Sequence, residues 1–229
     1  MDYQADLGLW KDACVALARL AGVMARLRAP DGCSWDREQT WETIAPYTIE
    51  EAYEVADAIA RADVPELREE LGDLALQVVY HAQIGAEAGA FTLADVLNGI
   101  ADKMVRRHPH VFGSVDAHDA ASVEANWDAI KAAEKPAGRP LEGVAVALPA
   151  LMRAQKLAKR AAAAGIALPE ALGRDDLAAL PSAERETAAG TLLLQLAASL
   201  REAGVDAETA LRRACDRLVE QAGRLAAKE

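Results

Sequence analysis

Apolar side chains recur along this chain at the three- and four-residue intervals of α-helices that bury one face. Residues 7–27 carry Leu, Val and Met at this spacing, and a turn sequence containing Pro and Gly follows them. The same criteria predict a second helix over residues 48–61 and a third over residues 63–88. The first half of the chain therefore begins with amphipathic helices.

The helical pattern continues beyond these three segments. Two more helices are predicted over residues 92–107 and 122–134. Three further helices are predicted in the second half, over residues 148–164, 182–203 and 206–226. Aromatic residues are only 4% of the chain, and few stretches show the β-branched alternation of strands. The sequence therefore predicts an all-α fold.

A stretch with two prolines and two glycines separates the helices into two groups. The predicted parts are a catalytic domain over residues 1–135, a linker over 136–147 and a second helical domain over 148–229. The second domain resembles a degenerate repeat of the first, because Ala188 and Thr191 stand where the first has Glu70 and Asp73. We therefore expect the second domain to be structural and non-catalytic.

Two pairs of carboxylates with a spacing of three residues, Glu51 with Glu54 and Glu70 with Asp73, lie in successive predicted helices. Three residues of helix turn through about 300° and rise about 4.5 Å, so each pair projects from one helix face. If the helices pack antiparallel, the four carboxylates converge and repel one another unless a cation or protons compensate them. Oxygen ligands without His or Cys select Mg²⁺, Mn²⁺ or Ca²⁺ over softer metals. We expect Mg²⁺, with Mn²⁺ as a substitute, and magnesium suggests phosphates.

The acidic residues also have a purely structural interpretation. Thr48 and Glu51 have the spacing of a capping box, in which the Thr48 side chain bonds the Glu51 amide and Glu51 reciprocates. Glutamates in a first helical turn also suit the helix dipole, and a charged helix face is usually solvated. From the spacing alone, both interpretations stay open.

Bulk composition limits the classes of partner. The chain has 229 residues, and its 52% hydrophobic content allows a substantial core. A formal net charge of −11 argues against nucleic-acid binding, which needs an excess of Lys and Arg to neutralise phosphates. Cys14, Cys33 and Cys215 lack metal-ligand spacing and predict reduced thiols in the cytoplasm. No stretch approaches the apolar length of a membrane span, so neither secretion nor membrane association is expected.

Cations and aromatic residues at helical spacing supply candidates for nucleotide binding. Lys103 with Arg107, and Trp127 with Lys131, form two i, i+4 pairs that each share one helix face. Arg offers forked donors to phosphate oxygens, Lys offers a point charge, and Trp offers a flat surface for a base. Trp35 is a second stacking candidate. Each of these residues also has an ordinary alternative, such as complementing a helix dipole or packing in the core.

Four other polar or aromatic residues receive no chemical role. His108 and His110 flank a proline at a helix end, where a capping and docking function is the more common one. Tyr47 and Tyr53 are interpreted as packing residues.

The motifs together resemble the MazG family. They are Gly-Cys-Ser-Trp-Asp, Glu-Glu-Ala-Tyr-Glu, Glu-Leu-Gly-Asp and Lys-x-x-Arg-Arg-His-Pro-His-Val-Phe, in this order. The similarity covers about residues 7–135 and continues through 148–156. It implies the family's all-α nucleoside triphosphate pyrophosphohydrolase fold, Mg²⁺ dependence and a homodimer.

The resemblance also assigns residues. The positions that match the family's Mg²⁺ ligands are Glu51, Glu54, Glu70 and Asp73. The positions that match nucleotide contacts are Lys103, Arg107, Trp127 and Lys131. Glu50 matches the extra acid of the family's Glu-Glu-x-x-Glu pattern, and would support the metal ligands or orient water.

These features predict Mg²⁺-dependent hydrolysis of nucleoside triphosphates to the monophosphate and pyrophosphate. Stacking discriminates bases poorly, so we expect broad specificity and a housekeeping role in the nucleotide pool. Specialised dUTP, dCTP or phosphoribosyl-ATP pyrophosphatases use a similar acidic core and stay open. So does a noncatalytic nucleotide-sensing or dimerisation module. A di-iron carboxylate bundle is a weaker alternative, because it normally needs Glu-x-x-His and neither acidic pair supplies the His.

Overall fold

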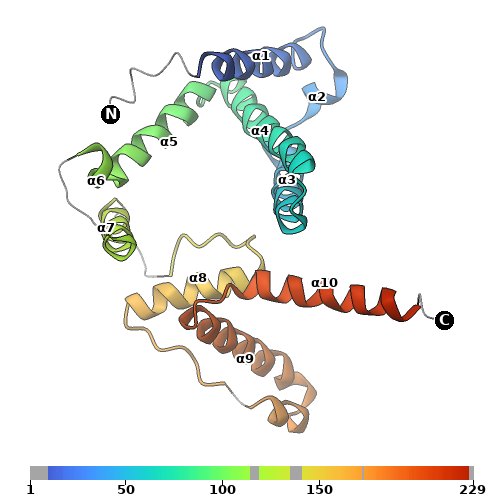
Figure 1. The fold of residues 1–229 in the computed structure, drawn as a ribbon, viewed down its shortest axis with the longest axis vertical. Coiled ribbons are helices and arrows are strands. Elements are labelled where there is room, and N and C mark those ends of the chain that lie inside the picture. Colours follow the sequence, from blue (N-terminus) through green and yellow to red (C-terminus); the bar gives the residue numbers. More distant parts are fainter. Residues whose placement is uncertain (1–9, 114–118, 135–140, 172, 227–229) are drawn as a thin grey trace. The chain divides into compact units, whose positions relative to one another are not determined.

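The computed structural model describes residues 10–113, 119–134, 141–171 and 173–226 (Figure 1). Within these ranges the chain forms helices and no strands, which confirms the predicted all-α class. The chain divides into two compact units, Met1–Ala132 and Ala133–Glu229. The catalytic and structural roles assigned to the two halves from the sequence remain predictions.

The helices are named in chain order. The first group comprises α1 (Lys11–Leu27), α2 (Ser34–Glu38), α3 (Trp41–Arg61), α4 (Val64–Glu87), α5 (Leu93–Arg107), α6 (Pro109–Phe112) and α7 (Ala120–Ala133). The second group comprises α8 (Ala150–Ala163), the 3-10 helix η1 (Arg174–Ala179), α9 (Ser182–Glu202) and α10 (Ala207–Ala226). Among the described residues, no helix combines the length and apolar character needed to cross a membrane.

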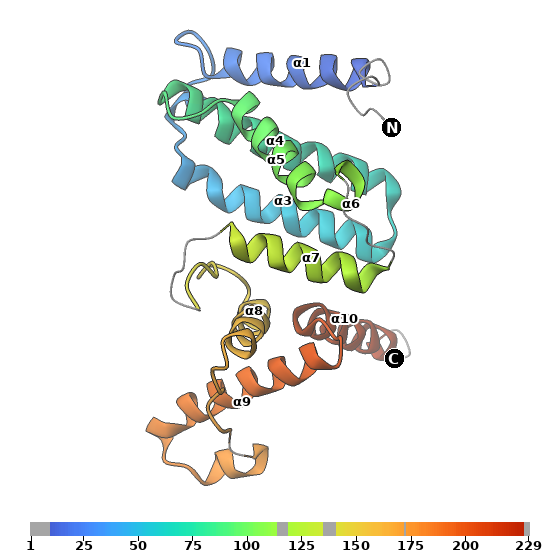
Figure 2. The same cartoon turned by 90° about the vertical axis from the view of Figure 1, so that its left-hand side faces the viewer.

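Helices α3 and α4 form a tight antiparallel hairpin and lie side by side (Figures 1 and 2). Ala62 ends α3 in the left-handed conformation, at φ 55°, which reverses the chain within a very short turn. Asp63 then caps α4, because its side chain accepts a hydrogen bond from the Glu66 amide at 3.1 Å. Pro65 lies in the first turn of α4, where a missing N–H costs nothing. This hairpin carries all four predicted metal ligands.

The beginning of α3 differs from the sequence prediction. The helix starts at Trp41 and is capped by a reciprocal box between Thr40 and Thr43, so the prediction of a start at Thr48 was wrong. Pro46 misled that prediction, since a proline this close to the start of a helix removes only one hydrogen bond. Thr48 lies inside the helix, and no capping box forms with Glu51. The capping-box interpretation of Glu51 was therefore wrong.

The core of the first unit lies between α1, α3 and the second half of α4. Its buried members are Met24, Ile44, Val79, Tyr80 and Ile84, and leucines of α1 pack around them. In the last turn of α4, Gly85 lies against the ring of Phe91, which stacks on Trp41 with centroids 6.0 Å apart. The core therefore fixes one end of the α3–α4 hairpin and leaves the end near Ala62 for polar residues.

Helix α5 packs against α4 and leads to α6 and α7. A reciprocal capping box between Thr92 and Asp95 begins α5, as the sequence predicted for Thr92. In Figure 1, α6 and α7 lie at the far end of α5, apart from α3 and α4. The short helix α6 was not predicted, because its four residues are too few to show a period.

The second unit is a small bundle in which α8 packs against α9 and α10, and η1 packs against α9. Its buried apolar residues are alanines of α8, α9 and the start of α10. Small side chains let these helices approach closely. Gln155 of α8 joins them, since its amide donates to the Val205 carbonyl at 2.8 Å and accepts from the Ala207 amide at 3.2 Å.

Candidate metal and nucleotide site

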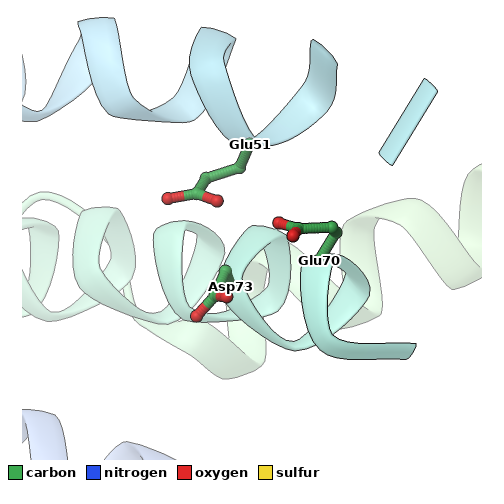
Figure 3. Close-up of side chains that lie close together, drawn as sticks. All are labelled: Glu51, Glu70 and Asp73. Carbon is green, nitrogen blue, oxygen red and sulfur yellow. The ribbon is translucent and has the colours of Figure 1, made fainter. Parts of the chain in front are cut away.

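Three carboxylates from the hairpin converge on one point. Glu51 of α3 and Glu70 and Asp73 of α4 each offer an oxygen, and these oxygens lie within 4.8 Å of one another (Figure 3). All three residues are half-buried. Figure 3 shows Glu51 extending from its helix toward the two acids of the facing helix. The arrangement presents only oxygen atoms, which is the donor set that hard divalent cations prefer.

The register of the hairpin explains this convergence. Glu51 and Asp73 are equally far from Ala62 in the sequence, on opposite sides of it. Glu54 and Glu70 are also equally far from Ala62. An antiparallel pair with a tight turn places such positions opposite one another. The three-residue spacing then stacks each pair along one face. Local sequence and one turn therefore suffice to assemble the acidic cluster.

Partial desolvation and neighbouring negative charges raise the pKa values of two carboxyl groups in this cluster. Partial desolvation raises the pKa of Glu51, and the negative charges of Asp73 and Glu54 raise it further. Partial desolvation likewise raises the pKa of Glu70, assisted by the charges of Glu54 and Asp73. Charged carboxylates at this separation are unfavourable, and either protons or a cation relieve them. The donor set and the repulsion both fit a divalent metal ion.

Glu54 and Glu50 do not join the three close oxygens. Glu54 is exposed and lies outside the group, although its charge raises the pKa of both Glu51 and Glu70. It is therefore near enough to contribute after a side-chain rotation. Glu50 is also exposed. Its position next to Glu51 on α3 turns it about 100° away from the metal-facing side.

Gln77 contacts the cluster but was given no site role in the sequence analysis. It is only 6% exposed, and its Nε2 lies 3.4 Å from a carboxylate oxygen of Glu51, at the long limit of a hydrogen bond. Its Oε1 is buried without a hydrogen-bond partner among the described residues. Gln77 follows Asp73 by one helical turn, so the i, i+4 spacing from a predicted ligand was the signal that pointed to it.

A second cluster joins α7 to the end of α5. The Arg107 guanidinium lies over the Trp127 ring, 5.2 Å from its centroid, and the His108 ring meets the same tryptophan at 5.0 Å. Arg107 is buried and Trp127 is half-buried. The structure thus brings together two residues that the sequence nominated separately for nucleotide binding, and the contact is a cation–π interaction.

The histidines beside this cluster lie at the junction of α5 and α6. His108 ends α5 and precedes α6, and its Nδ1 lies 2.7 Å from the Met104 carbonyl oxygen. A carbonyl oxygen only accepts, so Nδ1 carries the proton. The His110 ring lies 5.6 Å from that of His108. This position at a helix junction agrees with the capping and docking function expected from the sequence.

The remaining predicted cations lie near the second cluster along the chain. Lys103 is half-buried one turn before Arg107, and Lys131 is exposed one turn after Trp127. The carboxylate cluster lies on the α3–α4 hairpin, whereas these cations lie on α5 and α7.

Trp35 lies next to the α3–α4 hairpin. It is exposed on the short helix α2, and its ring meets the edge of Tyr47 with centroids 6.4 Å apart. Tyr47 precedes Glu51 by one turn of α3, so an aromatic pair stands beside the carboxylate cluster. The sequence analysis treated Tyr47 as a packing residue, and its contact with Trp35 is of that kind.

A buried polar network holds α2 in place. The Tyr80 hydroxyl lies 3.0 Å from both the main-chain carbonyl and the carboxylate of buried Asp36. Arg28 donates to the carbonyls of Asp36 and Gln39 and pairs with the Glu87 carboxylate at 2.8 Å. Burial and the Asp36 hydrogen bond raise the pKa of Tyr80 to about 12, so its hydroxyl stays protonated and able to donate. Hydrogen bonds from Tyr80 and Arg28 therefore fix the position of α2, the helix that carries Trp35.

Fold and site together define an all-α protein with a carboxylate cluster whose oxygen atoms fit a divalent cation. Comparison with known proteins identifies the family. Residues 39–112 match the MazG nucleotide pyrophosphohydrolase domain. The chain is also 44% identical over 214 residues to a nucleoside triphosphate pyrophosphohydrolase of Escherichia coli strain K12, covering 86% of this chain and 81% of that protein.

A second relative agrees. The chain is 38% identical over 222 residues to the nucleoside triphosphate pyrophosphohydrolase/pyrophosphatase MazG of Thermotoga maritima, covering 92% of this chain and 86% of the relative. A nucleoside triphosphate pyrophosphohydrolase of Mycobacterium tuberculosis is 39% identical over 163 residues, covering 69% of this chain and 48% of its own length. The chain belongs to the MazG family, as its motifs predicted.

Proposed function

We propose that this chain hydrolyses nucleoside triphosphates to nucleoside monophosphates and pyrophosphate, using Mg²⁺ held by the α3–α4 hairpin. The enzyme class, a hydrolase acting on phosphoric anhydride bonds, follows from the family and from the names of its relatives. The observation that carries the proposal is the convergence of Glu51, Glu70 and Asp73. Charged carboxylates held this close repel one another, and a bound divalent cation would relieve that repulsion.

The four acids would hold the metal, with Glu54 completing the set by rotation toward the three close oxygens. When bound, the ion supplies charge neutralisation for the triphosphate and lowers the pKa of a coordinated water. Gln77 would act as a positioning residue, since its amide lies against Glu51. Glu50, exposed beside Glu51, would accept a proton from water or orient it. Water attacks the α-phosphorus in this proposal, and pyrophosphate leaves.

Cations and aromatic residues would bind the rest of the nucleotide. Lys103, Arg107 and Lys131 would contact phosphate oxygens, where their charge offsets the charge of the transferred group. Trp127 or Trp35 would stack on the base. A flat ring reads no hydrogen-bonding edge, which supports broad specificity and a general role in the nucleotide pool.

A homodimer would bring these groups together. The carboxylates lie on the α3–α4 hairpin and the Arg107–Trp127 cluster joins the end of α5 to α7, and in a dimer a second copy would supply the other half of each site. Exposed apolar side chains on α4 and α5 support such an interface: Leu71, Val78, Val96, Leu97 and Ile100. Exposed apolar side chains on two helices that pack together would supply area for such a contact.

The location of the protein in the cell is part of the same proposal. Cys14, Cys33 and Cys215 are all free in the structure, which fits the reducing cytoplasm that the sequence analysis predicted.

A pair of neighbouring glutamates tests the catalytic proposal. Glu70→Gln removes one ligand charge and keeps the side-chain shape, whereas Glu69→Gln removes the same charge from an exposed position outside the cluster. We expect Glu70→Gln to lower kcat at least about a hundredfold, on the scale of lost metal support, and Glu69→Gln to stay near wild type. Turnover is measured with MgCl₂, and EDTA should abolish it.

The outcome that contradicts the proposal is specific. If Glu70→Gln and Glu69→Gln hydrolyse the triphosphate equally well, the carboxylate cluster is not the metal site. Far-ultraviolet circular dichroism on both variants separates a loss of chemistry from a loss of fold.

A further inference from the structure

The second unit contains a basic hollow that the proposed activity does not use. Residues of α8, of the end of α9 and of the beginning of α10 line an open hollow of about 270 Å³. Its lining residues are Met152, Gln155, Lys156, Lys159, Arg201 and Asp206. A water molecule takes about 30 Å³ in the liquid, so the space admits a hydrated small molecule. All of these residues lie in the unit where Ala188 and Thr191 replace the acidic ligands.

Hydrogen bonds connect the helices that line this hollow. The lining residues of α8 recur at positions 152, 155, 156 and 159, which is one face of a helix. Gln155 is buried at its floor and donates to the carbonyls of Ala197 and Val205 while accepting from the Ala207 amide. This amide thereby ties α9 and the start of α10 to α8, so the cations around it are carried on fixed elements.

The charge of the hollow is the reverse of that of the whole chain. Three cations line it against the single carboxylate of Asp206. That carboxylate is already engaged, because it caps α10 by accepting from the Thr209 amide at 2.8 Å. Helix α8 carries four Lys or Arg residues and no acid, in a chain with a net charge of −11. Such concentration of positive charge favours a small anion, while the overall charge disfavours nucleic acids.

Arg201 supplies an independent indication of a ligand. It extends from the last turn of α9, and its Nε is buried without a hydrogen-bond partner among the described residues. A buried guanidinium N–H without an acceptor carries a desolvation penalty. An oxyanion in the hollow would supply that acceptor, and Lys156, which is exposed at the rim, would supply a second charge.

We propose that this hollow binds a small phosphate-type oxyanion without a metal ion, through Arg201 and Lys156. Forked arginine donors with a lysine charge suit phosphate oxygens. The ligand is inorganic pyrophosphate or the phosphate of a nucleoside monophosphate, which share this chemistry. The inference goes beyond the proposed catalytic function and assigns a second anion site to the unit that lacks the acidic set.

Isothermal titration calorimetry of the full chain tests this proposal. Sodium pyrophosphate is titrated at low salt in EDTA, so that no metal-dependent binding contributes. We expect one site per chain, and a loss of affinity of about tenfold or more in both Lys156→Gln and Arg201→Gln. Arg213→Gln, which removes a cation from an exposed position of α10 outside the hollow, should bind as the wild type does. Lys156 is exposed, so its variant is expected to fold.

A second titration with AMP distinguishes the two sources. Tighter binding of pyrophosphate assigns the hollow to the inorganic anion, and tighter binding of AMP assigns it to a nucleotide phosphate. The proposal is overturned if neither anion binds in EDTA. It is also overturned if Arg213→Gln weakens binding as much as the two hollow variants, because the effect is then one of overall charge.

This test is independent of the catalytic proposal. Repeating the titration in the Glu70→Gln background changes the carboxylate cluster and leaves the second unit intact. Unchanged pyrophosphate binding there places the anion outside the catalytic site, and lost binding returns it to the first unit and overturns the proposal.

Discussion

Glu51 illustrates how one side chain links folding, charge and function. Its position opposite Asp73 places it among carboxylates in a half-buried site. Desolvation first, and the charges of Asp73 and Glu54 next, raise the pKa of its carboxyl group. The folded protein therefore binds this proton more tightly than the unfolded chain does. The metal-free protein carries a stability penalty that a bound cation would remove.

The first prediction follows from the sign of this shift. Stability contributed by Glu51 falls as pH rises from the unfolded pKa of 4.5 through the raised folded pKa, and the penalty persists at neutral pH. In EDTA, Glu51→Gln should therefore raise the urea midpoint at neutral pH. The gain should vanish below about pH 4, where the Glu51 carboxyl group of the wild type is protonated and therefore as uncharged as the glutamine of the variant. MgCl₂ should stabilise the wild type more than the variant.

Urea unfolding followed by circular dichroism at both pH values measures this difference. A variant less stable than the wild type at neutral pH in EDTA would show that Glu51 is compensated within the chain, and that the cluster has no need of a cation.

At the scale of elements, the short helix α2 depends on residues far from it in sequence. Tyr80 of α4 and Arg28 donate hydrogen bonds to buried Asp36 of α2, whereas Trp35 of the same helix is exposed to solvent. The hydrogen bonds that fix α2 are therefore separate from the aromatic surface that would contact the nucleotide. Removing one of these hydrogen bonds should alter nucleotide binding more than the rate of the chemical step.

Tyr80→Phe tests this arrangement. Removing the hydroxyl leaves the buried Asp36 oxygens without that donor and should cost about 1–2 kcal/mol of unfolding free energy. We expect KM for the triphosphate to rise several-fold while kcat changes little. Tyr47→Phe is the control, since among the described residues its hydroxyl has no hydrogen bond and its ring would keep the contact with Trp35. Equal KM values for both variants would refute a positioning role for Tyr80.

The sequence predicted the elements that depend on local signals. Helices with a long apolar period and a clear cap, such as α5 after Thr92, were found close to their true bounds. The beginning of α3 was missed because Pro46 looked like a boundary, whereas the helix starts at the Thr40 capping box. Helix α2 has five residues and owes its position to Tyr80 and Arg28. Periodicity carries no information about such a contact.

The site was predictable to the same extent. The acidic cluster follows from two i, i+3 pairs and one tight turn, so Glu51, Glu70 and Asp73 could be named from the sequence. Gln77 was given no site role because its approach to Glu51 is a tertiary contact. The pairing of Arg107 with Trp127 likewise depends on how α7 packs, which local spacing does not determine.

At the scale of the whole molecule, we propose that the active site is shared between two chains. Glu70→Gln and Arg107→Gln would each inactivate the enzyme from a different part of the site. If the site is shared between copies, unfolding and refolding a mixture of the two inactive variants forms heterodimers with one intact site. We expect activity to return in the mixture, as measured by pyrophosphate release.

The same experiment can contradict the shared site. A mixture that remains inactive, although light scattering shows a dimer, would place both groups of residues in one chain's own site. A single refolded variant is the control, because it contains no intact partner.

The central claim is that water attacks the α-phosphorus of a nucleoside triphosphate at the carboxylate cluster. The most direct test is turnover with MgCl₂ in water enriched in ¹⁸O, followed by mass spectrometry of the products. The account predicts nucleoside monophosphate carrying ¹⁸O and unlabelled pyrophosphate, with no products in Glu70→Gln. Label in pyrophosphate, or release of diphosphate and orthophosphate, would contradict it.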